Sequence, residues 1–323
     1  MMTNRKAALT AGAVLGLLAI APMQAQAQTA GLGTTNAGAT NQLATNIAAV
    51  VSSKSAVQLR TQGMAGAAQY IPRINAGQLA FGVANLVETR FSISGEAWMA
   101  GKPNPNIKIV ASLFPFKAGL VVKADGPIKT VADLKGRRIP SGFSGNPLGD
   151  RVFDAVLATA GLKRSDVQQI PIPTFPRMFD TFEQQQIDTS IAAFGSGRLM
   201  QMESVLKGIR YLSMPNTPEA LAQFQKLMPG STFTRVTKDM PASTGVAGEA
   251  WIFQYEYLLF AGAHVPDATV AAVAKALFEN EKDLKATGAL WNEYDPKLLA
   301  KDIGAEFHPG ARKFYESVGI WKR

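Results

Sequence analysis

The sequence contains no cysteine, and His264 and His308 are the only histidines among its 323 residues. The absence of cysteine excludes disulfide bonds and a lipid anchor on an N-terminal cysteine. The two histidines lie far apart in the sequence, and each is followed within two residues by a proline. Because protein zinc sites are built mainly from cysteine and histidine ligands, this composition argues against one. We expect neither a metal nor a cofactor.

Motifs that mark common enzyme classes are also absent from the sequence. It has no G-x-S-x-G nucleophile elbow, no Walker phosphate loop and no G-x-G-x-x-G dinucleotide fingerprint. Each histidine is therefore expected to lie on the surface or to cap a helix. We predict no catalytic residues and a protein that is not an enzyme. An exported hydrolase using a serine of a glycine-rich loop stays open as the least favoured alternative.

Charge is unbalanced, with 33 Lys and Arg against 24 Asp and Glu and a formal net charge of +9. The basic residues are scattered, and the densest clusters are Lys135-Gly136-Arg137-Arg138 and Lys322-Arg323. Nucleic-acid-binding chains typically show a basic stripe interleaved with aromatic residues, which this sequence lacks. We therefore expect no nucleic-acid partner, whereas attraction of an anionic solute is compatible with this charge.

The first 27 residues have the pattern of a secretory signal peptide. Arg5 and Lys6 are followed by a stretch without charge over residues 7–22, and Ala25 and Ala27 supply the small residues of a cleavage site. The apolar stretch is shorter than the ~20 residues that a membrane span requires. We predict cleavage near Ala27 and release of a freely diffusing protein into a Gram-negative periplasm.

The remaining chain is long enough for two domains, and the hydrophobic content of the full sequence, 47%, is that of a globular protein. Strand-like and helix-like segments alternate along it after a Gly/Thr/Asn-rich opening over 31–41, which predicts an α/β fold. Strands are expected at 56–61, 79–84, 108–113, 118–123, 138–141, 168–172 and 187–194, and in the apolar segment that begins at Trp251. Helices are expected at 42–53, 67–76, 150–160, 179–185 and 267–285.

A glycine-rich loop, Ser141-Gly142-Phe143-Ser144-Gly145-Asn146, lies between an expected strand and an expected helix. In open α/β sheets, ligands bind at the carboxyl ends of strands, where the N–H groups of helix starts suit anionic oxygens. By itself the loop is explained equally well as a plain connection.

Several segments resemble known families of exported binding proteins. The segment from Asp125 to Ile139, running into Ser141–Asn146, resembles a strand-loop signature of type II periplasmic binding proteins. Four others resemble the TAXI class of TRAP-transporter receptors, and together the matches cover nearly the whole mature chain in order: Gly77–Asn85, Gln186–Gly195, Ala276–Asn280 and His308–Gly319. The His-Pro-Gly-Ala helix start at His308 is the most specific of them.

Two loops depart from the pattern of that class. The first loop, Thr34–Asn41, lacks the tyrosines of typical members, and Phe143-Ser144-Gly145-Asn146-Pro147 stands where a Pro-Gly-Ser-Gly-Thr loop is usual. The amino-acid or dicarboxylate ligands of the class therefore cannot be transferred directly.

The resemblance implies a two-lobed type II periplasmic binding protein fold with a ligand cleft between the lobes. Residues 28–123 and 239–323 would form lobe I, and residues 124–238 would form lobe II. Loop residues of both lobes are then expected to contact the ligand: Thr34, Thr35, Asn36, Asn85, Ser141, Gly142, Phe143, Ser144, Gly145, Asn146, Phe194, Gly195 and Ser196. Phe143 and Phe194 would cover its apolar part.

The implied function is that of a monomeric periplasmic receptor. It would capture a small organic anion, such as a carboxylate, keto acid or amino acid, and deliver it to the membrane subunits of a TRAP-type transporter. A sensory receptor that presents its bound ligand to a membrane kinase or chemoreceptor is the main alternative.

Overall fold

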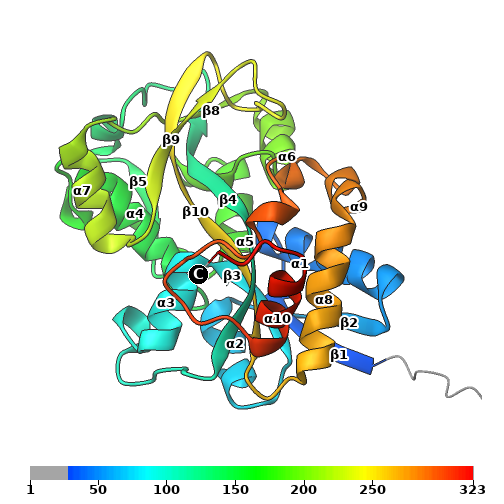
Figure 1. Ribbon diagram of the computed structural model, residues 1–323. Coiled ribbons are helices and arrows are strands. Elements are labelled where there is room, and N and C mark those ends of the chain that lie inside the picture. Colours follow the sequence, from blue (N-terminus) through cyan, green and yellow to red (C-terminus); the bar gives the residue numbers. More distant parts are fainter. Residues whose placement is uncertain (1–27, 323) are drawn as a thin grey trace, which may run out of the picture.

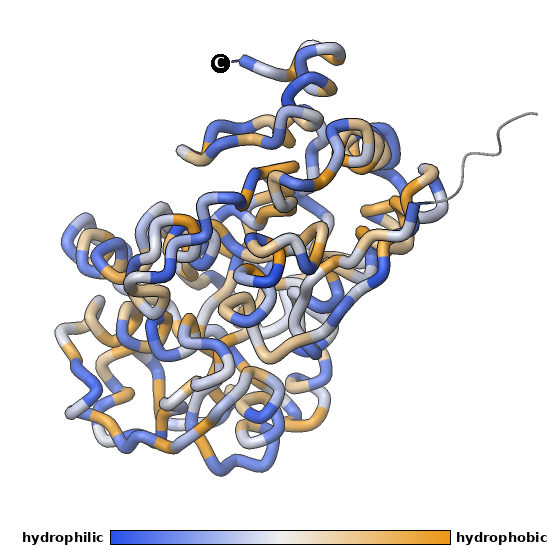
Figure 2. The backbone as a smooth tube through the Cα atoms, turned by 90° about the horizontal axis from the view of Figure 1, so that it is seen from below, coloured by the Kyte–Doolittle hydropathy of each residue, from blue (hydrophilic) through white to orange (hydrophobic). Residues whose placement is uncertain are grey.

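The computed structural model describes residues 28–322, so the predicted signal peptide at 1–27 lies outside the described residues. The described chain has a mixed α/β fold, which confirms the predicted class (Figure 1). No helix in this range is both long enough and apolar enough to cross a membrane. Hydrophilic residues are spread along the coloured part of the trace rather than gathered in one segment (Figure 2).

Eight strands form the main sheet, in the order β2-β1-β3-β10-β4-β7, with β8 paired to β4 and β9 paired to β10. Its strands are β1 (Gln28–Thr35), β2 (Val57–Met64), β3 (Phe81–Asn85), β4 (Ile107–Lys123), β7 (Ser190–Ala193), β8 (Ile209–Tyr211), β9 (Thr232–Thr237) and β10 (Glu249–Gly262). Strands β1, β2 and β3 are parallel, whereas β10 is antiparallel to β3, β4 and β9. Two further strands, β5 (Arg138–Ser141) and β6 (Gln168–Pro171), form a small parallel sheet.

Within residues 28–322, ten α-helices pack around these sheets. They are α1 (Ala39–Lys54), α2 (Ala67–Asn75), α3 (Leu86–Ser94), α4 (Leu148–Thr159), α5 (Phe175–Glu183), α6 (Gly197–Leu206), α7 (Pro218–Leu227), α8 (Asp267–Glu279), α9 (Glu281–Ala286) and α10 (Pro309–Ser317). Helix α8 packs against α1 and α10 beside β2, while α4 and α7 pack together at the opposite end of the molecule (Figure 1).

The long strands β4 and β10 connect these two ends. The first half of β10 pairs with β9 and its second half with β3, and the second half of β4 pairs with β7 and β8. The sequence predicted two short strands separated at Phe114-Pro115-Phe116, and this was wrong, because β4 continues through Pro115. Proline lacks the N–H of a sheet ladder. The register shift between Tyr257 and Leu258, next to this point, is an irregularity of the kind that accommodates such a residue.

Other predicted elements have different bounds in the structure. Strand β1 extends into the Gly/Thr/Asn-rich opening as far as Thr35, and Gly33 is required in it because a Cβ there would lie 2.8 Å from the Cβ of Tyr70. The helix predicted over 267–285 is divided at Asn280, whose backbone is not helical. Helix α5 begins at Phe175, four residues before the prediction, because Thr174 caps it and Pro176 lies in its first turn. The strand predicted from Trp251 is confirmed as part of β10.

Candidate ligand-binding site

A cavity of about 920 Å³, part of it open to solvent, lies where the loops after β1, β3, β6 and β7 meet β4 and β10. Parallel strands β1 and β3 end here, as does β7, so the cavity occupies the position expected for a ligand in an open α/β sheet.

Aromatic rings form much of the cavity wall. Phe116 of β4 stacks on Tyr255 of β10 with ring centroids 5.7 Å apart, and it also contacts Tyr257 at 4.7 Å. Phe175 and Phe179 of α5 line another part, with centroids 6.4 Å apart. These rings provide a surface that suits the apolar body of a small organic molecule.

Helix α1 begins at the cavity without a side-chain cap. Its N-cap is Gly38, which adopts φ 85° and has no side chain to accept a hydrogen bond from the first turn. Thr40 of that turn lines the cavity and shares a hydrogen bond with the hydroxyl of Tyr257. The free N–H groups of an uncapped helix start, together with the helix dipole, favour a negatively charged group.

Asn85 and Glu88 form a closed pair where β3 passes into α3. The Asn85 Oδ1 atom accepts from the Glu88 N–H at 2.9 Å, and the Asn85 Nδ2 atom donates to Glu88 Oε2 at 2.5 Å. Both residues are buried and line the cavity. Removal of the Glu88 carboxyl from water raises its pKa to about 8, because burial disfavours the charged form.

Arg198 is the basic side chain on the cavity wall, and its charge is already paired. It lies 2.7 Å from Asp180 and 3.2 Å from Glu183, with its guanidinium over the ring of Phe179. The Nε atom of Arg198 is buried and has no hydrogen-bond partner among the described residues, so both this atom and the uncapped start of α1 are donors that a ligand could use.

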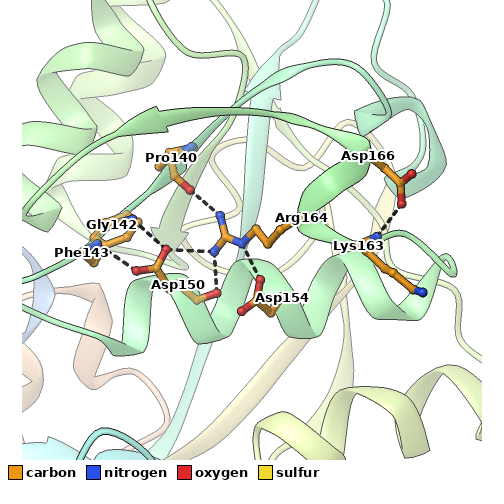
Figure 3. A network of polar contacts seen from close by, with 8 residues as sticks. All are labelled: Pro140, Gly142, Phe143, Asp150, Asp154, Lys163, Arg164 and Asp166. Carbon is orange, nitrogen blue, oxygen red and sulfur yellow. Dashed lines mark hydrogen bonds and ion pairs between the residues drawn. The ribbon is translucent and has the colours of Figure 1, made fainter.

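The glycine-rich loop is held by Asp150 of α4, whose carboxylate accepts from the N–H groups of Gly142 and Phe143 at 3.0 and 2.9 Å (Figure 3). Arg164 donates to Asp150, Asp154 and the carbonyl of Pro140, and so fixes the acceptor in place (Figure 3). The N–H groups of Ser144, Gly145 and Asn146 are bonded to the carbonyls of Gly142, Pro173 and Phe143. Every N–H from Gly142 to Asn146 is therefore used inside the protein.

Of the residues predicted from the sequence, the structure brings five together around the cavity: Thr35, Asn36, Asn85, Asn146 and Ser196. The hydroxyl of Ser196 caps α6 and donates to the carbonyl of Ala193. By contrast, Asn146 Oδ1 is buried and has no hydrogen-bond partner among the described residues, so it is available to a ligand.

The other predicted residues lie outside the cavity lining. Thr34 is buried and donates to the carbonyl of Thr40. Phe143 lies in the core against Phe153 and Phe175, and Phe194 lines a separate hollow with Met240. Ser141, Gly142, Ser144, Gly145 and Gly195 complete this group.

Several lining residues were missed, namely Thr40, Glu88, Phe116, Phe175, Phe179, Arg198, Tyr255 and Tyr257. Alternation in the segment from Trp251 is the signal that could have identified the two tyrosines, because residues 255 and 257 share one face of a strand. Glu88 stands three residues after Asn85, which is the pattern of a capping pair and is ordinarily found on the surface.

The fold is that of the two-lobed periplasmic binding proteins, as comparison with solved structures shows. PhnD1 from Prochlorococcus marinus, solved in complex with methylphosphonate, is 10% identical over 91% of this chain and 99% of its own, with a TM-score of 0.56. A structure described as a periplasmic transporter is 12% identical over 91% and 94%, with a TM-score of 0.56. A protein from Bordetella bronchiseptica RB50 is 14% identical over 91% and 99%, with a TM-score of 0.52.

The sequence profile of the NMT1-like family matches residues 28–319, and the chain belongs to this family.

Proposed function

We propose that this protein is a periplasmic solute-binding receptor for a small organic anion that has an apolar body, such as a carboxylate, keto acid or amino acid. The observation that carries the proposal is the uncapped start of α1, which faces an aromatic-walled cavity of about 920 Å³. An acid group would lie against the N–H groups of this first turn, and the apolar body would lie among Phe116, Phe175 and Tyr255.

A receptor is favoured over an enzyme because the cavity contains no arrangement for catalysis. His264 and His308 are both outside its lining. His308 caps α10 by accepting from the N–H of Gly310 at 3.2 Å, which is a structural role. Among the described residues, the hydroxyl of Ser196 is bonded to the backbone groups of Ala193 and Leu199.

We further propose that residues 28–123 and 239–323 form one lobe and residues 124–238 the other, with β4 and β10 serving as the connection. Ala118 pairs with Phe253, and Phe116 pairs with Tyr255, at the level where the two strands line the cavity. A rotation at this level would open and close the cavity, which is the hinge motion expected of such receptors.

We propose export to the periplasm and delivery of the ligand to a TRAP-type membrane transporter. Support for export comes from the signal-peptide pattern and from the family match, which begins at residue 28 directly after the predicted cleavage site. Support for the TRAP partner is the resemblance of His308–Gly319 and three other segments to TAXI receptors. A gene for a fused TRAP membrane protein beside this one would favour it, and a gene for an ATP-driven permease would contradict it.

Thermal-shift screening of the mature protein tests the ligand class. The panel contains short dicarboxylates, keto acids, amino acids, aromatic acids and methylphosphonate, with neutral sugars as controls. A ligand at about 100 times its Kd stabilises the folded state by ~2.7 kcal/mol, which is readily detected. A shift with acids alone is expected. A shift with neutral solutes alone would refute the proposed anionic ligand.

A further inference from the structure

Glu88 is a carboxyl group on the cavity wall with no ion pair to a basic side chain in the described part of the chain. Its residue is 6% exposed, and it lies in the first turn of α3. The groups that face it are neutral: Tyr70 of α2, Tyr255 and Tyr257 of β10, and the amide of Asn85. An ionised carboxylate in such surroundings is strongly disfavoured, so the group keeps its proton.

Arg198, a basic residue on the same cavity wall, does not pair with Glu88 and so does not stabilise its ionised form. Arg198 is held by Asp180 and Glu183, and within residues 28–322 no lysine, arginine or histidine forms an ion pair with Glu88. The carboxyl group of Glu88 is therefore free to interact with the Asn85 amide and with a bound ligand.

Asn85 determines which oxygen carries the proton. Its Oδ1 atom accepts from the Glu88 N–H, so its other amide atom must be the donor Nδ2. That donor lies 2.5 Å from Glu88 Oε2, which is therefore an acceptor. The acid proton is assigned to Oε1, and this atom has no hydrogen-bond partner among the described residues.

We propose that Glu88 acts as a neutral carboxylic acid whose Oε1–H donates a hydrogen bond to the acid group of the ligand. It thereby selects organic acids over amines and alcohols of the same shape. This inference rests on the proposed function and specifies the ligand class of the same site. The O–H···O⁻ bond between an acid and a carboxylate is among the stronger hydrogen bonds in proteins.

The start of α1 favours an acid over an amine, although Asn146 Oδ1 is an unpartnered acceptor on the same cavity wall. The uncapped first turn of α1 presents N–H groups, and Thr40 in that turn presents a hydroxyl. An amine would face the positive end of this helix. It would also require Glu88 to lose its proton, whereas burial raises the pKa of this carboxyl to about 8.

Proton-dependent affinity follows from this arrangement. A bound carboxylate raises the pKa of Glu88 further, because a neighbouring negative charge disfavours ionisation. Above about pH 8, binding must therefore take up a proton, and the affinity falls about tenfold for each pH unit. Between the ligand's own pKa and about pH 8, the affinity is constant.

The experiment uses three probes with the same phenyl body and different head groups: phenylacetate, phenethyl alcohol and phenethylamine. Calorimetry measures the Kd of each for the mature protein from about pH 6 to about pH 10. Phenylacetate is expected to bind at least tenfold more tightly than the other two. Glu88→Gln keeps an N–H donor at this position, so it should retain most of the affinity and lose the pH dependence up to about pH 10. Glu88→Leu should bind phenylacetate at least tenfold more weakly.

Glu256→Gln is the matched control, because Glu256 lies on the other face of β10, where it accepts from Ser112 at 2.8 Å. This variant should reproduce the wild-type pH profile. If phenylacetate binds but its affinity is independent of pH and of Glu88→Leu, the role of Glu88 is refuted while the receptor function stands. Preference for phenethylamine, with loss of binding in Glu88→Gln, would show an anionic counter-ion and overturn the inference.

A second measurement is independent of ligand binding. NMR of protein labelled at the side-chain carboxyl carbon of glutamate follows the titration of Glu88 directly, with Glu88→Gln identifying its signal. A midpoint near pH 8 is expected for the empty receptor. A midpoint near the ordinary value of 4.5 would overturn the inference whichever probes bind.

Discussion

The carbonyl oxygen of Gly145 lies 2.6 Å from the position that a Cβ atom would take on Gly66. On the other side of the same contact, a Cβ on Gly145 would lie 2.9 Å from the Cβ of Ala65. The backbone of Gly66 is extended, with φ −178°, so any residue could adopt it and the restriction is one of space. The loop before α2 and the loop before α4 therefore meet at the cavity edge because both are built from small residues.

Gly66→Val should prevent this contact and weaken ligand binding. The added side chain meets backbone atoms, which cannot move aside as a flexible side chain could. If the two loops belong to different lobes, the closed form is destabilised relative to the open one, and the affinity falls about tenfold or more. Calorimetry gives the affinity, and small-angle scattering should show a larger radius of gyration in the presence of ligand. Gly248→Ala is the control, because a Cβ there meets no atom within 4 Å; wild-type affinity of Gly66→Val would contradict closure at this contact.

Asn146→Ala and Ser144→Ala are expected to differ although they lie two residues apart. Asn146 is 4% exposed, lines the cavity and has an unpartnered Oδ1 atom, whereas Ser144 is exposed and outside the lining. Loss of a buried hydrogen bond to ligand costs ~1–3 kcal/mol, which weakens the Kd by about 5–150-fold for Asn146→Ala. Ser144→Ala should leave the Kd unchanged. Equal effects of the two substitutions would show that the loop acts through its backbone.

Asp150→Asn should loosen the glycine-rich loop. The carboxylate accepts two backbone N–H groups and pairs with Arg164 at 3.1 Å, and an amide offers only one oxygen for these three interactions. We expect a loss of ~1–3 kcal/mol in the free energy of unfolding and faster amide exchange at Gly142 and Phe143. Urea unfolding and hydrogen exchange measure these two effects. Unchanged exchange at both amides would refute the proposed anchoring of the loop.

Glu88 should make the protein less stable as the pH rises. Its pKa is about 8 when folded and 4.5 ordinarily, so between these values the folded chain keeps a proton that the unfolded chain has released. Stability from this group is complete below about pH 4.5 and is lost at ~1.4 kcal/mol per pH unit up to about pH 8, above which both states are ionised. The free energy of unfolding of Glu88→Gln relative to wild type should therefore rise between about pH 4.5 and about pH 8 and stay constant at higher pH. Urea unfolding at several pH values measures the difference, and a constant difference would contradict the assignment.

How far the sequence predicts this structure depends on whether the deciding interaction is local. The α/β class and the strand from Trp251 follow from local periodicity and turn residues, and the structure has them. The helix predicted from Asp150 is also present, but it begins two residues earlier, at Leu148. Strand β1 was missed because its glycines are unfavourable in strands, and the reason for Gly33 is Tyr70, which lies on α2.

The same distinction applies to the cavity. Asn85, Asn146 and Ser196 were predicted because each follows a strand, and all three line the cavity. Alternation along the segment from Trp251 places Tyr255 and Tyr257 on one face of a strand. Which face lines the cavity is decided by the nonlocal pairing of β10 with β3, through which Tyr257 reaches Thr40. Similarly, two of the loop donors expected to bind an anion, the N–H groups of Gly142 and Phe143, are bonded to Asp150, a partner that no local pattern identifies.

Gly310→Ala should be strongly destabilising, and it tests why the His-Pro-Gly-Ala helix start is built from these residues. His308 caps α10, Pro309 begins it, and Gly310 lies against the start of α8, where a Cβ would come within 2.8 Å of the Cα of Asp267. Because the atom that this Cβ would meet belongs to the backbone of Asp267, helices α8 and α10 must move apart. This should cost ~1–3 kcal/mol in the free energy of unfolding. His308→Ala should cost ~1 kcal/mol through loss of the cap.

Lys313→Ala is the matched control for this contact, since it removes an exposed ion pair to the same Asp267 at 2.8 Å and leaves the helix packing intact. Thermal unfolding of the three variants should give a large fall in Tm for Gly310→Ala, a moderate one for His308→Ala and almost none for Lys313→Ala. If Gly310→Ala unfolds at the wild-type temperature, close packing of α10 on α8 is not the reason for this glycine. Ligand affinity should be unchanged in all three folded variants, because none of these residues lines the cavity.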